Sequence, residues 1–336
     1  MVTLFITHDS GLLGKKGESL SFAYARGQKP SSIPIHLIDD VIVLGRGNVS
    51  TPALHLLMDE NIPVHFINGS GQYKGSLTSA QGSKYAIRKE QFNAAVSLQR
   101  TLQIARHVVS SKLLSQRKTL QRSRNRHFQE DNEISRVCKG LSAAACHAQQ
   151  SSDIEELRGI EGAGAAAYFS VFEKMLQEPW FFKTRTRRPP KDPVNALLSF
   201  GYTLLLSRVV SALCVTGLDP CVGFLHPEYR GRPALALDLM EEFRSPIVDR
   251  MVIGTLNQRY LKPEQFFRTD EGGCFMESNA RKTFLEQFIT RLDTKITNEN
   301  TGQNATFRNH ILMQAQSFCL ALKNNEEYHP LSIETR

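Results

Sequence analysis

The hydrophobic pattern of the chain changes near Lys84, and this change constrains the fold more than any other feature. Before it, short runs rich in β-branched and aromatic residues alternate with turn residues, which predicts strands. The runs are TLFIT, SLSFAYA, IPIHLI, DVIVLG and IPVHFIN, and the turns include SGLLGKKGE, GRGN and GSGQYKG. Beyond it, long segments of helical character follow. We therefore predict an α+β multi-domain chain, with residues 1–82 forming a small β-rich domain and residues 83–330 a larger all-α domain.

Capping residues locate two helices in this pattern. Ser50 or Thr51 is a suitable N-cap for a short helix in the β-rich part, and Pro52 suits its first turn. Asp192 followed by a proline predicts the start of a second helix, which Gly217 ends. Further helices are expected over 153–178, from about 233 onward, and over 275–323 as two helices separated by TNENTGQN. The polar, Ala/Ser-rich residues 127–152 are expected to be a loop or a loose helical connector.

Charge narrows the class of partner. The chain has 336 residues, a net charge of +8 and a pI near 9.2, which favours a polyanion, either nucleic acid or an anionic membrane surface. No apolar run is long enough to cross a membrane without a charge, since Arg208 interrupts the most apolar one. The start, MVTLFITHDS, lacks the pattern of a signal peptide, so we expect a cytoplasmic protein and nucleic acid as the partner. The six cysteines form no CxxC pair, which favours reduced, packed thiols.

Two segments concentrate positive charge. Residues 84–126 hold eleven Lys and Arg residues and a single acid, Glu90. A solvated helix face normally mixes both signs, so a face that contacts phosphates is the preferred interpretation. The second segment, FFKTRTRRPPKDP, precedes the Asp192 cap. Its basic residues are Lys183, Arg185, Arg187, Arg188 and Lys191.

The acids of the chain suggest a metal site between these basic segments. Asp238, Glu241 and Glu242 lie opposite the apolar face of the helix that begins near residue 233. One interpretation is an exposed acidic face; the other is a divalent cation site, which His226 in the preceding turn could complete. Glu161 falls on the apolar stripe of helix 153–178, where a carboxylate needs a partner. That partner could be an arginine or a metal ion, or Glu161 could lie in the first helical turn.

Several long segments resemble a known family. They are EGAGAAAYF at 161–169, RTRRPPKDPVNALLSFGYTLL at 185–205, GLDPCVGFLHPEYRGRPALALDLMEEFRSPIVDR at 217–250 and the N-terminal GRGNVSTPAL and IPVHFINGSGQYKG. Together they resemble the CRISPR adaptation integrases, the larger CRISPR-associated protein of spacer acquisition. The resemblance covers nearly the whole chain.

The resemblance implies a metal-dependent DNA endonuclease and integrase that serves antiviral defence. It places the metal ligands and catalytic residues at Glu161, His226 and Glu241, with Mg²⁺ or Mn²⁺ as the ion. Asp238 and Asn195 take supporting roles. The resemblance further implies that the N-terminal domain drives formation of a homodimer, and that a small ferredoxin-like CRISPR adaptation protein bridges two dimers.

The chemistry expected from these residues is transesterification. A 3′-hydroxyl of short double-stranded DNA would attack a phosphodiester of the CRISPR array, and water in its place would give nuclease activity. The DNA backbone is expected to contact Arg185, Arg187, Arg188 and Lys191. Two alternatives stay open: a structure-specific, metal-dependent nuclease acting on branched DNA in repair, and a non-catalytic DNA-binding scaffold whose acids form only a solvated helix face.

Overall fold

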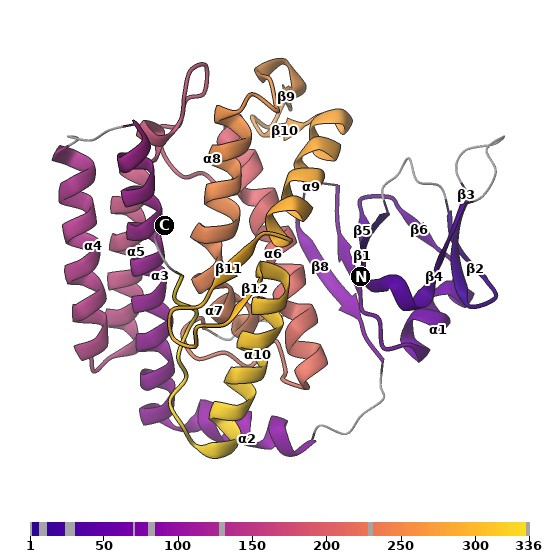
Figure 1. The fold of residues 1–336 in the computed structure, drawn as a ribbon, viewed down its shortest axis with the longest axis horizontal. Helices are drawn as coiled ribbons and strands as arrows, with labels where there is room; N and C mark the ends of the chain where they lie inside the picture. Colours follow the sequence, from indigo (N-terminus) through magenta and orange to yellow (C-terminus); the bar gives the residue numbers. More distant parts are fainter. Residues whose placement is uncertain are drawn as a thin grey trace. The chain divides into compact units, whose positions relative to one another are not determined.

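The chain folds into two compact units, Met1–Ser83 and Lys84–Arg336 (Figure 1). The computed structural model describes residues 2–6, 12–23, 31–69, 71–79, 85–127, 132–227 and 231–333. The first unit is rich in strands and the second in helices, so the predicted α+β class is confirmed.

The first unit contains two four-stranded sheets. In one, β1 (Val2–Ile6), β5 (Ile38–Leu44) and β7 (Val64–Ile67) run parallel, and β8 (Tyr73–Leu77) pairs antiparallel with β7. The β7–β8 hairpin turns within the predicted GSGQYKG stretch, whose last three residues, Tyr73–Gly75, already belong to β8. The other sheet has the order β4-β3-β2-β6, with bounds Ser31–Pro34, Ser19–Ala23, Leu12–Lys16 and Asn48–Val49.

Helix α1 (Thr51–Asp59) contributes to the core of this unit. Ser50 caps it as predicted, accepting a hydrogen bond from the amide of Ala53. Both sheets and α1 bury apolar side chains in one cluster, which explains why strands and helix pack together. Members of the cluster are Ile6, Leu13, Leu20, Val41, Val43, Leu57 and Val64.

Two details of the first unit differ from the sequence prediction. The stretch SGLLGKKGE, expected as a turn, contains strand β2, in which Leu13 is buried and neighbouring residues face outward. The run IPIHLI, expected as a strand, ends β4 at Pro34 and continues as a 3₁₀ turn, Ile35–Leu37. A strand of five residues with one buried side chain gives too weak an alternation to recognise.

The second unit is built around α3 (Leu98–His127), which packs against α4, α5 and α7 (Figure 1). The α-helices of this unit have the following bounds: α2 Tyr85–Val96, α4 Asn132–Gln150, α5 Ile154–Ser170, α6 Pro193–Thr216, α7 Ala234–Phe243, α8 Arg250–Asn257, α9 Ser278–Leu292 and α10 Phe307–Asn324. A π-helical segment, Arg244–Asp249, joins α7 to α8, and 3₁₀ turns occupy Phe172–Met175 and Pro263–Gln265.

Helix α6 begins and ends where its capping residues predict. Asp192 accepts a hydrogen bond from the amide of Asn195, a proline occupies the first position, and Gly217 ends the helix in the left-handed conformation. By length and composition α6 could cross a membrane, yet 72% of its apolar window is buried inside the protein. Packing in the core therefore accounts for its apolar sequence.

Residues 127–152 are not a connector, contrary to the prediction, because most of them form α4. Its buried residues, Ile134, Cys138, Leu141, Ala145 and Ala148, recur every three or four positions and face α3 and α5. Small alanines and a cysteine give this stripe little hydrophobicity in the sequence, although they allow close helix packing.

The second unit is also not purely helical. Short antiparallel hairpins join β9 (Phe266–Arg268) to β10 (Cys274–Met276) and β11 (Lys295–Thr297) to β12 (Asn304–Thr306). The second hairpin contains the whole of the expected TNENTGQN linker. Three-residue strands with polar side chains carry no period that a sequence pattern can show.

Candidate active site

The acids of α7 are buried, not exposed. Asp238, Glu241 and Glu242 retain 1%, 2% and 3% of their accessible surface. The interpretation of these residues as a solvated acidic face is therefore wrong. Three carboxylates at this depth need compensating groups, and the structure supplies a different set to each.

Asp238 holds His226 in a fixed orientation. Its carboxylate accepts hydrogen bonds from the amides of Phe224, Leu225 and His226, at 2.6, 3.0 and 3.0 Å. The His226 Nδ1 atom lies 2.6 Å from Asp238 Oδ1, so Nδ1 donates to the carboxylate and Nε2 faces Glu241. A carboxylate that fixes the tautomer in this way is typical of a metal-binding histidine.

The loop before His226 approaches α7 closely. A Cβ atom on Gly223 would lie 2.9 Å from Asp238 Oδ2 and 2.7 Å from the Cβ of Ala234. Glycine is therefore required here for the amides of the loop to reach Asp238.

Lys112 contacts both predicted carboxylate ligands, Glu161 and Glu241. Its Nζ atom forms an ion pair with Glu161 Oε1 and lies 2.8 Å from Glu241 Oε2. The imidazole Nε2 of His226 lies 3.8 Å from Glu241 Oε1. The structure thus brings Glu161, His226 and Glu241 together from α5, the loop before α7 and α7 itself.

Glu161 is only partly buried, with 26% of its side chain exposed, and its partner is a lysine instead of the expected arginine. It lies in the middle of α5, so the interpretation as a first-turn residue is wrong. The long, basic α3 is a core helix at this point, because Lys112 is 8% exposed and points inward. Nothing in the sequence separates Lys112 from the other cations of residues 84–126.

Glu241 remains ionised in this environment. Burial alone would raise its pKa, but Arg244, Lys112 and His226 oppose that effect and lower the pKa to about 2. The Nε atom of Arg244 lies 3.0 Å from Glu241 Oε2. This oxygen is buried and, among the described residues, no group forms a well-oriented hydrogen bond to it.

The donor set fits a hard divalent cation. Two carboxylates and one imidazole nitrogen suit Mg²⁺ or Mn²⁺, and the buried Glu241 Oε2 already neutralises cations, Lys112 at 2.8 Å and Arg244 at 3.0 Å. In the described part of the chain, no three His, Cys, Asp or Glu side chains are grouped closely enough to ligate one ion. The Lys112 ammonium contacts both carboxylates in this arrangement.

A second polar group adjoins the site and was missed by the sequence interpretation. Asp249, at the end of the π-helical segment, accepts hydrogen bonds from the hydroxyls of Tyr168 and Tyr202. Burial raises the pKa of all three residues. Lys112, Glu241 and Asp249 line one small cleft together with Arg185, Arg187 and Arg244.

Arg185 belongs to the wall of this cleft, and Asn195 holds it there. The Asn195 side chain accepts from Arg185 Nη1 at 2.7 Å and donates to the carbonyl of Thr184 at 2.8 Å. Arg185 also donates to Ser199 Oγ at 3.0 Å, and burial lowers its pKa. Arg185 therefore binds its own chain, whereas the other predicted DNA-binding residues, Arg187, Arg188 and Lys191, are exposed.

The family model of the CRISPR associated protein Cas1 matches residues 4–290. The chain belongs to the Cas1 family. This confirms the family that the sequence segments resemble. The CRISPR-associated endonuclease Cas1 1 of Chlorobaculum tepidum is 32% identical over 333 residues, which cover 98% of this chain and 97% of that protein.

Solved structures of Cas1 proteins share the fold. A Cas1 protein from Thermotoga maritima is 25% identical, with a TM-score of 0.81, and the alignment covers 99% of this chain and 100% of that chain. A chain of a Cas6-RT-Cas1–Cas2 complex is 26% identical, with a TM-score of 0.83, and the alignment covers 98% of this chain and 36% of that chain.

Proposed function

We propose that this chain is a metal-dependent DNA endonuclease and integrase of CRISPR spacer acquisition. The observation that carries the proposal is that Lys112 contacts both Glu161 and Glu241, while His226 Nε2 lies 3.8 Å from Glu241 Oε1. Membership of the Cas1 family and the endonuclease relative in Chlorobaculum tepidum support it.

Glu161, His226 and Glu241 would hold the Mg²⁺ or Mn²⁺ ion, which would offset negative charge on the reacting phosphate. Asp238 keeps the Nε2 atom of His226 directed at Glu241. The low pKa of Glu241 keeps its carboxylate ionised at neutral pH. Arg244 adds fixed positive charge at the edge of the proposed metal site, where a phosphodiester must approach.

The reaction proposed is an exchange of phosphodiester bonds. A 3′-hydroxyl of the incoming DNA forms a new bond to phosphorus, and the bond between phosphorus and the 3′-oxygen of the target strand breaks. With water as the attacking group, the same site cleaves DNA. Arg187, which lines the cleft, and the exposed Arg188 and Lys191 are proposed to contact the DNA backbone.

The assembly is part of the same proposal. We propose that the first unit mediates a homodimer and that the dimer binds the small ferredoxin-like adaptation protein. The similarity to a chain of a Cas6-RT-Cas1–Cas2 complex supports such an assembly. Action on DNA inside the cell implies a cytoplasmic location.

Burial of the acids argues against a non-catalytic scaffold, because that alternative rests on an exposed acidic face. Buried ionised carboxylates next to a histidine at a cleft are typical of functional sites. The repair nuclease shares the site, so only an assay of the product separates it from the integrase.

The test combines purified protein, Mn²⁺, a short duplex with free 3′ ends and a supercoiled plasmid carrying a repeat array, with and without the small partner. Joined product is expected from the wild type and not from Glu161→Ala. Glu155→Ala is the matched control, because Glu155 lies on the same helix with 74% of its side chain exposed. Cleavage of branched DNA without joining would favour the repair nuclease, and DNA binding without chemistry would favour the scaffold.

A further inference from the structure

The small cleft that adjoins the proposed metal site has the size of a single hydroxyl group. Its volume is about 20 Å³, which accommodates one water molecule or one hydroxyl. Lys112 and Glu241 line it, and Gln116 lines it one helical turn after Lys112 on α3. A group bound in this cleft would therefore lie beside Glu241, one of the proposed metal ligands.

Gln116 brings an unpaired acceptor to the cleft. The residue is 4% exposed, and its Oε1 atom is buried without a hydrogen bond to any residue that the structure describes. A buried acceptor without a donor is unfavourable, and buried polar groups as a rule have a partner in the protein, in water or in a ligand. The amide oxygen of Gln116 therefore indicates a donor that enters the cleft from outside the chain.

The other buried polar side chains of the cleft already have partners within the chain. The charged ones each form an ion pair or a hydrogen bond; they are Lys112, Arg185, Glu241, Arg244 and Asp249. The hydroxyls of Tyr202 and Ser245 donate to Asp249 and Thr119. Within the described ranges, Gln116 is thus the buried side chain of the cleft that is left to bind a ligand.

The chemistry of the amide oxygen selects the ligand. An amide oxygen accepts hydrogen bonds, so its partner must be a donor. A phosphodiester offers only acceptors, and a nucleobase, which carries N–H donors, is too large for about 20 Å³. The small donors that take part in the proposed reaction are the 3′-hydroxyl of DNA and water.

We propose that Gln116 Oε1 binds the attacking hydroxyl group, the 3′-hydroxyl in joining and water in cleavage, and orients its oxygen toward phosphorus. This role rests on the proposed function. An amide is too weak a base to take the proton, so the proton passes to solvent as the oxygen bonds to phosphorus. The leaving oxygen keeps the electrons of the broken bond and takes up a proton.

The test compares Gln116→Met with the wild type in joining and in cleavage at saturating Mn²⁺. Methionine keeps the length of the side chain but has only a weak acceptor. The kcat of both reactions is expected to fall about 100-fold, because a misplaced reacting group costs about that factor. The KM for DNA and the Mn²⁺ affinity measured by calorimetry are expected to stay unchanged.

Thermal unfolding without DNA and metal separates this role from a structural one. Gln116→Met is expected to melt at or above the wild-type temperature, because it removes a buried acceptor that has no partner among the described residues. A lower melting temperature with an unchanged kcat would assign Gln116 a structural role only.

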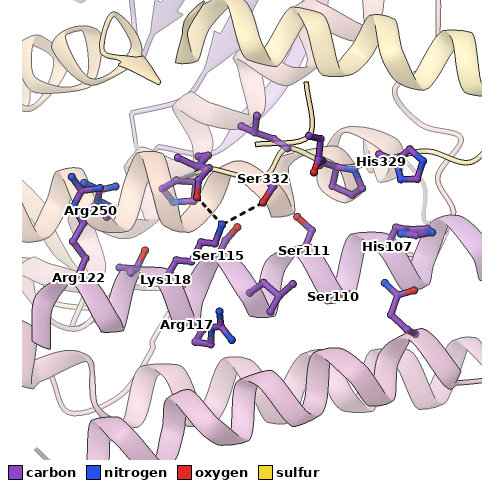
Figure 2. A pocket seen from close by; sticks show the side chains of 18 residues that line it. His107, Ser110, Ser111, Ser115, Arg117, Lys118, Arg122, Arg250, His329 and Ser332 are labelled. Carbon is purple, nitrogen blue, oxygen red and sulfur yellow. Dashed lines mark hydrogen bonds between the residues drawn. The ribbon is translucent and has the colours of Figure 1, made fainter. Parts of the chain in front are cut away.

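Gln149→Met is the matched control. Gln149 lies on α4 and lines a different cavity, of about 310 Å³, which Figure 2 shows along α3. Ser111, Ser115 and Lys118 of α3 line that cavity, and no described residue lines both it and the cleft. Gln149→Met is expected to leave kcat unchanged.

Gln116→Glu is a second variant, which keeps an acceptor oxygen at the same place and is expected to react faster than Gln116→Met. Equal kcat in Gln116→Met and the wild type would overturn the role of Gln116 alone, and so would equal kcat in the two variants. A wild type without any product would overturn the proposed function as well. If the wild type cleaves without joining, the integrase fails, and a slower cleavage by Gln116→Met still supports the role of Gln116.

Discussion

Replacing Lys112 by methionine tests how the buried carboxylates of the proposed metal site are stabilised. The lysine contacts Glu161 and Glu241, and only 8% of its side chain is exposed. Removing one partner of a buried ion pair costs about 3–5 kcal/mol. Arg244 stays 3.0 Å from Glu241, and Glu161 is 26% exposed and can be hydrated, so the lower end of this range applies.

A loss of about 3 kcal/mol corresponds to a fall of about 6–12 °C in melting temperature for a unit of this size. The measurement is thermal and urea unfolding in the presence of a chelator. Lys89→Met is the control, because Lys89 is exposed on α2, and it is expected to change the stability by less than about 0.5 kcal/mol.

Mn²⁺ provides the second half of this test. The lysine ammonium and a divalent cation neutralise the same two carboxylates, so Mn²⁺ is expected to raise the melting temperature of Lys112→Met more than that of the wild type. If Lys112→Met is as stable as Lys89→Met, the ammonium does not stabilise the carboxylates. If Mn²⁺ stabilises Lys112→Met and the wild type equally, the lysine and the metal do not neutralise the same carboxylates.

Three further predictions concern the same unit. Asp238→Asn is expected to weaken Mn²⁺ binding, measured by calorimetry, about 10–100-fold, because the orientation of His226 depends on this carboxylate; unchanged affinity would contradict that role. Gly201→Ala is expected to destabilise the protein by about 1–3 kcal/mol in urea unfolding, since its Cβ would lie 2.6 Å from a methyl group of Val248. Gly159→Ala, which meets nothing within 4 Å, is its control and should be neutral or stabilising. Burial raises the pKa of Glu242 from 4.5 to about 7, so the folded state binds a proton more tightly than the unfolded state, and the stability contributed by this group falls as pH rises through that interval. Glu242→Gln should flatten the pH dependence of the unfolding free energy measured in urea. An unchanged pH dependence would contradict this role of Glu242.

The sequence was sufficient where local chemistry decides structure. Asp192 and Gly217 cap α6 because a carboxylate and a left-handed glycine satisfy helix ends without help from the rest of the fold. His226 and Asp238 are close in sequence, and the Gly223 loop that returns to α7 is short. Their juxtaposition could therefore be anticipated from the turn that precedes the helix.

The sequence was insufficient where distant elements supply a partner. Lys112 is 49 residues from Glu161, and its neighbours on α3 include many other basic residues. Its inward direction follows from the packing of α3 against α5 and α7, which no local pattern reports. Arg100 and Arg106 of α3 donate to carbonyls of their own chain, at Ala321 of α10 and at Ser151 after α4. A run of basic residues was therefore an unreliable indicator of a DNA-facing surface.

Adjacent glutamates on α7 show how the surroundings divide roles between identical side chains. Glu242 accepts hydrogen bonds from Tyr328, Gln314 and the amide of Leu331, all neutral donors. These bonds lower its pKa but do not offset the effect of burial. Glu241, one residue earlier, faces Lys112 and Arg244 and stays ionised. Spacing in the sequence allows either residue to bind a metal. Glu241 keeps its negative charge at neutral pH, whereas burial raises the pKa of Glu242 to about 7, so we propose Glu241 and not Glu242 as the ligand.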